Sequence, residues 1–409
     1  MKNYLIIALA LCSAPCLAVD RIVEEFGVPP AFPSIASAIT AANDGDRIII
    51  KNRAGGVPWI ETINVAKSLE FLSFDNNGFF NVQGNWTLTA ATGRVIRIIG
   101  MYNTSGSITS SGTGTVGSAS VSILDSRLVN GNMTLTTAVF KNEVVGCTLE
   151  SGRIHLNMGS VIGCNINNQG VGHAIYINSA AAFQNDTSAV VGNIVVSTDS
   201  SPAIFMLTPA QVVHVRNNYI RHSNEGIRLN SGNTQAVPNL IRNNTIVALA
   251  GSVNNGINLG SLSSNSVWEV MNNAIRANTG NTKRGVHNGG SLGNAQVNVY
   301  WNVFDASLTV PVATGFTFVG NNVEGGNVNV DLATGALEAG SSGIDQANPA
   351  APFFDLDLSL GDAGAYGGSY TLVNFHPLHT GAARVFLAGH PYNIREGATL
   401  RVKAKAWDR

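Results

Sequence analysis

Short apolar runs, in which β-branched residues alternate with polar ones, follow one another along most of this chain. Between residues 144 and 323 one phrase returns: apolar, any, usually Gly or Asn, then Cys or Asn, any, apolar. A phrase that recurs with variable insertions is typical of a solenoid, whose units bury their apolar sides only by stacking on one another. No stretch keeps a helical period for three turns, so we predict that each unit is a coil of β-strands. The fourth positions of the phrase are Cys147, Cys164, Asn193, Asn218, Asn244, Asn273, Asn302 and Asn321.

The repeated Asn is expected where the chain bends between two strands. Asparagine tolerates the left-handed backbone conformation, and its amide can bond to the same amide one coil above and below. We therefore predict an asparagine ladder along the solenoid. Cys147 and Cys164 hold the same place in adjacent coils. Two interpretations stay open for this pair: a disulfide, or two buried free thiols that replace asparagine.

A second phrase, Gly or Ala, apolar, variable, apolar, follows the first in five coils. It begins at Ala174, Ala203, Gly226, Gly256 and Gly285. The two phrases together resemble those of right-handed parallel β-helix proteins of the pectate-lyase-like superfamily. That group includes pectin lyases, polygalacturonases, alginate and chondroitin lyases and many surface adhesins. The resemblance implies an all-β fold, a right-handed parallel β-helix solenoid with an N-terminal capping helix and a small C-terminal β cap.

Both ends of the chain differ from its repeating part. Residues 1–18 combine Lys2, an apolar run and small residues before position 19, which is the pattern of a signal peptide. Residues 32–42 form the clearest helical stretch, with Ser34 as the N-cap, and we expect this helix to cover the first coil. We assign residues 19–331 to the β-helix, in about 11 to 13 coils. Residues 332–409, where the phrases stop, are expected to form a C-terminal cap or small β module.

The composition indicates the cellular compartment of the protein and argues against some classes of binding partner. Charged residues make up 12% of the chain, the net charge is -1 and no basic cluster occurs, which argues against nucleic acid as a partner. No apolar run reaches the length of a transmembrane segment. Together with the signal peptide, these features predict a secreted or periplasmic protein, with display on the cell surface as a further option. They leave the oligomeric state open.

The variable position of the second phrase alternates with inward residues, so it is expected to face solvent. Read from coil to coil, this outward row consists of Tyr176, Phe205, Arg228, Asn258 and His287. Aromatic, cationic and amide side chains in a line suit a sugar chain that stacks on rings and forms hydrogen bonds. We therefore predict that an extracellular polysaccharide binds here, with Glu225 and Arg284 beside the row. The resemblance adds that enzymes of the superfamily place their catalytic groups on this face.

Three functions fit this row. The first is adhesin-like, non-catalytic polysaccharide binding, and the second is a polysaccharide lyase that cleaves a uronate-containing polymer by β-elimination. In the lyase, Arg228 would neutralise the sugar carboxylate and His287 would accept the α-proton. The third is a structural surface rod. The row contains no carboxylate and no Asp cluster, which disfavours hydrolases with paired Asp and calcium-dependent lyases. We therefore prefer the binding interpretation.

One stretch beyond the repeats has the spacing of a cation site. Asp355, Asp357 and Asp362 place oxygens at intervals that resemble a Ca²⁺ loop, but the central Gly and the terminal Glu of an EF-hand are missing. A turn stabilised by Asp side chains is the preferred interpretation, and Ca²⁺ is the alternative. We predict no other cofactor or metal.

Overall fold

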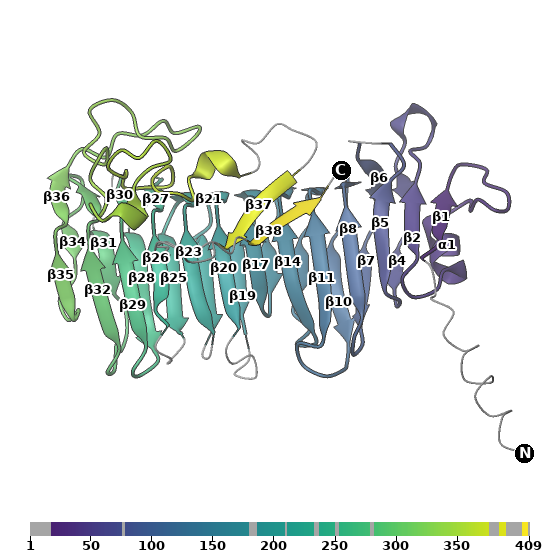
Figure 1. The fold of residues 1–409 in the computed structure, drawn as a ribbon, viewed down its shortest axis with the longest axis horizontal. Helices are drawn as coiled ribbons and strands as arrows, with labels where there is room; N and C mark the ends of the chain where they lie inside the picture. Colours follow the sequence, from purple (N-terminus) through teal and green to yellow (C-terminus); the bar gives the residue numbers. More distant parts are fainter. Residues whose placement is uncertain are drawn as a thin grey trace, which may run out of the picture.

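A computed structural model describes residues 18–75, 78–179, 186–208, 211–232, 237–249, 253–278, 282–375, 384–389 and 403–407. Within these residues the chain winds into a rod made of three parallel sheets (Figure 1). Each coil adds one strand to sheet A, then one to sheet B, then one to sheet C, and every strand pairs with its counterparts in the adjacent coils. The predicted right-handed parallel β-helix is confirmed.

The strands of the three sheets are short and evenly matched. Sheet A contains β1 (Asp20–Val23), β2 (Arg47–Ile50), β5 (Leu69–Ser73), β8 (Val95–Ile99), β11 (Ala119–Leu124), β14 (Phe140–Val145), β17 (Gly159–Ile162), β20 (Thr187–Val191), β23 (Val212–Arg216), β26 (Asn239–Arg242), β29 (Val267–Met271), β32 (Gln296–Tyr300) and β35 (Phe318–Gly320). Sheet B contains β3 (Trp59–Ile60), β6 (Phe80–Gln83), β9 (Met101–Asn103), β12 (Arg127–Val129), β15 (Thr148–Glu150), β18 (Asn165–Asn168), β21 (Ile194–Ser197), β24 (Tyr219–His222), β27 (Thr245–Ala248), β30 (Ala274–Arg276), β33 (Val303–Asp305) and β36 (Val323–Gly326). Sheet C contains β4 (Ile63–Val65), β7 (Trp86–Ala90), β10 (Ile108–Gly112), β13 (Met133–Leu135), β16 (Ile154–Leu156), β19 (Ile175–Asn178), β22 (Ile204–Thr208), β25 (Glu225–Ser231), β28 (Val253–Leu262), β31 (Thr282–Asn288) and β34 (Val310–Val312).

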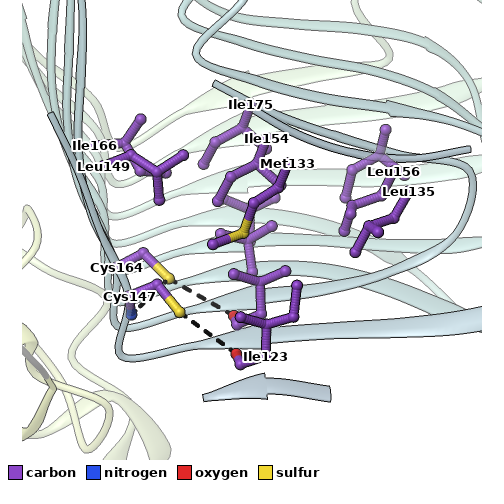
Figure 2. Packing of buried hydrophobic residues seen from close by; sticks show 14 of the residues in the cluster. Ile123, Met133, Leu135, Cys147, Leu149, Ile154, Leu156, Cys164, Ile166 and Ile175 are labelled. Atoms are coloured by element: carbon purple, nitrogen blue, oxygen red, sulfur yellow. Dashed lines mark hydrogen bonds between the residues drawn. The ribbon is translucent and has the colours of Figure 1, made fainter. Parts of the chain in front are cut away.

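The core is a set of columns in which apolar residues of adjacent coils lie on top of one another (Figure 2). Met133, Ile154 and Ile175 form one such column on sheet C, since their strands pair residue for residue. Leu149 and Ile166 form another on sheet B. Full burial of each Ile or Leu contributes about 1.5–3 kcal/mol, and only stacking on a neighbouring coil provides it.

The asparagine ladder is confirmed, and it lies inside the rod at the corner between sheets A and B. From Asn218 onward, the Oδ1 of each ladder Asn accepts the backbone N–H and the side-chain Nδ2 of the preceding ladder Asn. The Nδ2 to Oδ1 distances are 2.8–3.1 Å. The ladder therefore satisfies backbone groups that the corner leaves without a strand partner. Its members are Asn193, Asn218, Asn244, Asn273, Asn302 and Asn322.

Two details of the predicted ladder are wrong. The left-handed backbone belongs to the third position of the phrase and not to the Asn at the fourth, because the chain turns before the ladder residue enters the core. Third positions such as Gly192, Asn217 and Trp301 have φ of 66°, 52° and 55°. In the last coil the ladder member is Asn322, and Asn321 has φ 54°. The reason is register: Val319 pairs with Val299, so the last phrase begins one residue later than expected.

Cys147 and Cys164 continue this column as buried free thiols, not as a disulfide (Figure 2). The backbone N–H of Cys147 donates to Cys164 Sγ at 3.4 Å, and that of Cys164 donates to Asn193 Oδ1 at 2.8 Å. Each thiol also contacts a backbone carbonyl oxygen of sheet A. Sulfur is a poorer acceptor than an amide oxygen, so the column is bonded more weakly here than beyond Asn193.

The expected helix covers the first coil. Helix α1 (Ile35–Ala41) buries Ile35, Ala38 and Ile39 against the core. Ser34 caps it, since its hydroxyl accepts the N–H of Ser37 at 3.0 Å. Of the described part of the chain, no helix is long and apolar enough to cross a membrane.

The segment after β36 is the one for which we expect a C-terminal cap or a small β module. Its described part runs back along the flank, past sheet B and then sheet A (Figure 1). Ala365 and Tyr219 belong to one buried apolar cluster, and the N–H of Ala365 donates to Thr245 Oγ1 at 2.9 Å. Phe375 reaches the outer side of Val191. Strands β37 (Arg384–Gly389) and β38 (Lys403–Trp407) form a separate antiparallel pair.

Candidate functional site

The five residues of the predicted outward row occupy paired positions on consecutive strands of sheet C. These residues are Tyr176, Phe205, Arg228, Asn258 and His287. The row continues one coil further, because His155 pairs with Tyr176. Sequence reasoning missed His155 since its strand lacks the Gly or Ala that opens the second phrase. The alternation Ile154-His155-Leu156, with only the His facing outward, was the available evidence.

The aromatic half of the row is a stack. The rings of Tyr176 and Phe205 are parallel within 2°, with centroids 5.2 Å apart, and His155 stacks on Tyr176 at 4.5 Å. The guanidinium of Arg228 lies 5.8 Å from the Phe205 centroid. The faces of the Tyr176 and Phe205 rings therefore point along the rod axis and are covered by the neighbouring residues of the row. The ring edges point outward. The expectation that a sugar stacks on these faces is wrong, because in-register rings on a parallel sheet cover one another.

His155 within this stack and His173 beside it both have a lowered pKa. Burial lowers the pKa of His155 and of His173. His173 packs against Phe205 with centroids 4.9 Å apart, and its Nδ1 lies 3.0 Å from the carbonyl oxygen of Pro202. Both rings are therefore neutral at neutral pH and add no charge to the face.

The other half of the site is a polar cluster made of two adjacent rows of three residues. One row is Arg228, Asn258 and His287, and the other is Glu225, Asn255 and Arg284. Sequence reasoning named all of these except Asn255, which stands at the same offset before the Gly of its phrase as Glu225 and Arg284 do. The structure thus brings the predicted residues of this half together and adds one.

A buried carboxylate holds the polar cluster together. Glu225 is only 6% exposed, and its Oε1 accepts Nδ2 of Asn255 at 2.9 Å and Nδ2 of Asn258 at 2.6 Å. Its Oε2 lies 3.7 Å from Arg228 Nη1. Asn255 and Asn258 are themselves 4% and 5% exposed. The carboxylate therefore fixes both amides and balances the charge of the guanidinium.

The imidazole of His287 is occupied on one side. Arg284 Nη1 lies 3.1 Å from His287 Nε2. Because a guanidinium can only donate, Nε2 is the accepting nitrogen, and the neutral ring carries its proton on Nδ1. Burial, together with the charge of Arg284, lowers the pKa of His287. The ring is therefore a neutral donor at neutral pH and has no free lone pair.

Several polar atoms of this cluster lack a hydrogen-bond partner among the described residues. The acceptors are Glu225 Oε2, Asn255 Oδ1 and Asn258 Oδ1, and the potential donors are Arg228 Nε and His287 Nδ1. A buried polar atom without a partner carries a free-energy penalty of about 1–3 kcal/mol. The five atoms have almost no accessible surface, so the hydrogen bonding of this tightly packed cluster is incomplete beneath the face of sheet C.

The three aspartates of the Ca²⁺ alternative bond to the chain around them. Asp355 accepts the backbone N–H of Gly368 at 2.6 Å and that of Asp362, and Asp357 accepts the hydroxyl of Ser359 at 2.6 Å. Asp362 accepts a backbone N–H as well. In the parts of the chain that the structure covers, no three His, Cys, Asp or Glu residues are arranged to hold a metal ion. These side chains have the contacts of the preferred interpretation, a turn stabilised by Asp.

The three parallel sheets by themselves define the class of this protein, that of parallel β-helix proteins. No family model and no curated protein sequence matches this chain. Among solved structures, the crystal structure of pectate lyase Pel9A is similar, with 13% identity, a TM-score of 0.37, and coverage of 85% of this chain and 96% of that one. The predicted signal peptide lies almost entirely outside the described residues, which begin at Ala18.

Proposed function

We propose that this protein binds an extracellular polysaccharide along the outward face of sheet C and does so without cleaving it. The observation that carries the proposal is the outward row on consecutive strands of sheet C, with Glu225 and Arg284 beside it. The residues of the row are Tyr176, Phe205, Arg228, Asn258 and His287. A polysaccharide suits this place because it can follow a straight, regularly spaced row and can reach several coils at once. The proposal includes export of the mature chain to the periplasm or the cell exterior, from the composition and the N-terminal pattern of the sequence.

Non-catalytic binding is favoured over β-elimination by the state of His287. A lyase needs a base with a free lone pair next to the α-proton of the sugar. The Nε2 lone pair of His287 accepts from Arg284, and Arg228 lies against the carboxylate of Glu225. Both groups that the lyase interpretation requires are therefore engaged within the protein.

The test is affinity electrophoresis and pull-down of the purified mature protein on a panel of plant, algal and bacterial polysaccharides. Asn258→Ala removes an acceptor from the polar cluster and is expected to weaken retention about tenfold. Asn165→Ala is the matched control, since Asn165 is an outward asparagine on sheet B, away from the cluster. If neither protein is retained by any polymer, the proposed function is wrong. If ultraviolet absorbance reports unsaturated products that disappear in His287→Ala, the protein is a lyase.

A further inference from the structure

A pocket of about 460 Å³ opens at the N-terminal end of the rod, between the loop that follows β1 and the first strand of sheet B. The pocket exists because the first coil is incomplete. Sheet A begins with β1, but the chain then leaves the coil, and among the described strands sheet B begins one coil later, with β3. The apolar part of the lining includes Phe26, Pro33, Trp59 and Ile60. Because an apolar cavity of about 150 Å³ can hold a benzene ring, this pocket has room for an aromatic side chain.

Phe26 lies at the rim of this pocket as an exposed aromatic side chain. It is 87% exposed, and Ile60 of β3, which also lines the pocket, is 68% exposed. Backbone hydrogen bonds close the loop that carries Phe26. The N–H of Glu24 donates to the Phe32 carbonyl oxygen at 3.0 Å, and the N–H of Gly27 donates to the Glu24 carbonyl oxygen at 3.0 Å. The loop therefore holds Phe26 at the rim before any partner arrives.

The backbone of Phe26 is a second, independent indication of a role at this surface. Its φ is 61°, in the left-handed region that Gly and Asn adopt readily and bulky residues rarely do. A phenylalanine here adds backbone strain to the turn and also leaves its ring in solvent. Neither the turn nor the core therefore explains why this residue is aromatic, and a contact outside the chain does.

The carboxylates beside the pocket are paired within the chain. Arg53 Nη2 lies 2.8 Å from Glu25 Oε1, and Lys51 Nζ lies 2.6 Å from Glu24 Oε2. The two carboxylate oxygens of Glu61 each accept one of the first two N–H groups of α1, both at 2.9 Å. The surface around the pocket is therefore close to neutral, and an identical surface can approach it without repulsion between like charges.

We propose that this end of the rod is the interface of a homodimer, in which Phe26 of each copy enters the pocket of the other. A patch that carries both a projecting ring and a pocket is complementary to itself about a two-fold axis, where the same residues of both copies meet. The entering ring packs against Ile60 and Pro33 and leaves water. Aromatic side chains that fill a pocket of the partner dominate the binding energy of such interfaces. The inference is independent of the proposed function.

The test is size-exclusion chromatography with light scattering on the mature protein, over a range of micromolar concentrations and at low and high salt. We expect a dimer with a dissociation constant in the micromolar range, because the patch is small, and little effect of salt, because the contact is apolar. Phe26→Asn removes the ring and suits the left-handed backbone, so the loop keeps its conformation. It is expected to raise the dissociation constant at least about tenfold. Val171→Asn is the matched control, since Val171 is an apolar residue between β18 and β19 that is 84% exposed. Thermal unfolding checks the fold of both variants.

Each alternative outcome would overturn the proposal. A monomer at every concentration would do so, and so would a dimer that Phe26→Asn does not weaken, because the interface would then lie elsewhere. The apolar dye anilinonaphthalene sulfonate identifies a different occupant of the pocket. If the protein is monomeric and binds the dye, and Phe26→Asn abolishes this binding, the pocket is open for another partner and the second copy is not its occupant.

Discussion

The asparagine ladder is expected to be the most sensitive part of the rod, and Asn244→Leu tests this. The Oδ1 of Asn244 accepts the backbone N–H of Asn218 at 3.1 Å and its Nδ2 at 2.9 Å. All three groups are fully buried. Leucine removes the acceptor and leaves the backbone N–H and one Nδ2–H of Asn218 without a partner, while the other Nδ2–H keeps its bond to the Val190 carbonyl oxygen. At about 1–3 kcal/mol for each buried group, the free energy of unfolding should fall by about 2–6 kcal/mol.

The measurement is urea unfolding followed by far-ultraviolet circular dichroism, together with hydrogen–deuterium exchange at the peptide that contains the Asn218 amide. That amide should exchange faster in the variant, because its acceptor is gone. Asn322→Leu is the matched control: Asn322 makes the same contacts to Asn302 but lies at the half-buried end of the ladder, where water can replace it. Equal effects of the two substitutions, or a loss below about 1 kcal/mol for Asn244→Leu, would refute the reasoning.

Three further predictions concern other parts of the rod. Cys164→Asn should raise the free energy of unfolding by about 1 kcal/mol in the same urea assay, because an amide oxygen would replace sulfur as the acceptor of the Cys147 N–H. Phe375→Ala should release the flank segment, residues 327–375, because about 3–5 kcal/mol of packing is lost at a side chain that is 6% exposed. Limited proteolysis should then cut faster beyond residue 327 while the rod stays intact. Unchanged cleavage would contradict the prediction. Burial raises the pKa of Asp355 from 3.8 to about 6, so the folded state holds this proton more tightly than the unfolded state does. Stability of the flank segment should therefore fall as pH rises through that window. Asp355→Asn should reduce this slope in melts at about pH 4 and about pH 7, with the remainder due to Asp362, whose pKa burial also raises.

The fold could be predicted because the repeat lies in residues whose chemistry matches one position of a coil. An Asn that returns in coil after coil, each time in front of an apolar pair, suits a β-solenoid and few architectures besides, and the β-branched alternation fixes strands on both sides. The register failed only in the last coil, where two adjacent Asn, 321 and 322, both fit the fourth position by composition. The backbone conformation distinguishes them, and sequence alone does not contain it.

The flank segment shows a second limit of sequence reasoning. The end of the phrases correctly marks where the coils stop, but it does not say where the chain goes next. Ala363, Ala365 and Leu372 are small or apolar residues at irregular spacing, so no period indicates which surface they cover. Their partners, such as Tyr219 and Val303, are outward residues of sheet B that a solvent-facing position would not be expected to hold.

The row of candidate residues was accessible to sequence reasoning for the same reason as the ladder, since one residue per phrase faces outward. The chemistry of the row could not be predicted from the sequence, because it depends on contacts between residues of neighbouring coils. Arg228 and His287, taken by themselves, suggest the cation and the base of a β-elimination. The structure instead places a buried carboxylate beside Arg228 and a guanidinium beside His287. The sheet and the ladder hold the strands of adjacent coils at one spacing, so these side chains meet at the same positions in each coil. The cluster is therefore better described as a set of side chains bonded to one another than as a latent catalytic pair.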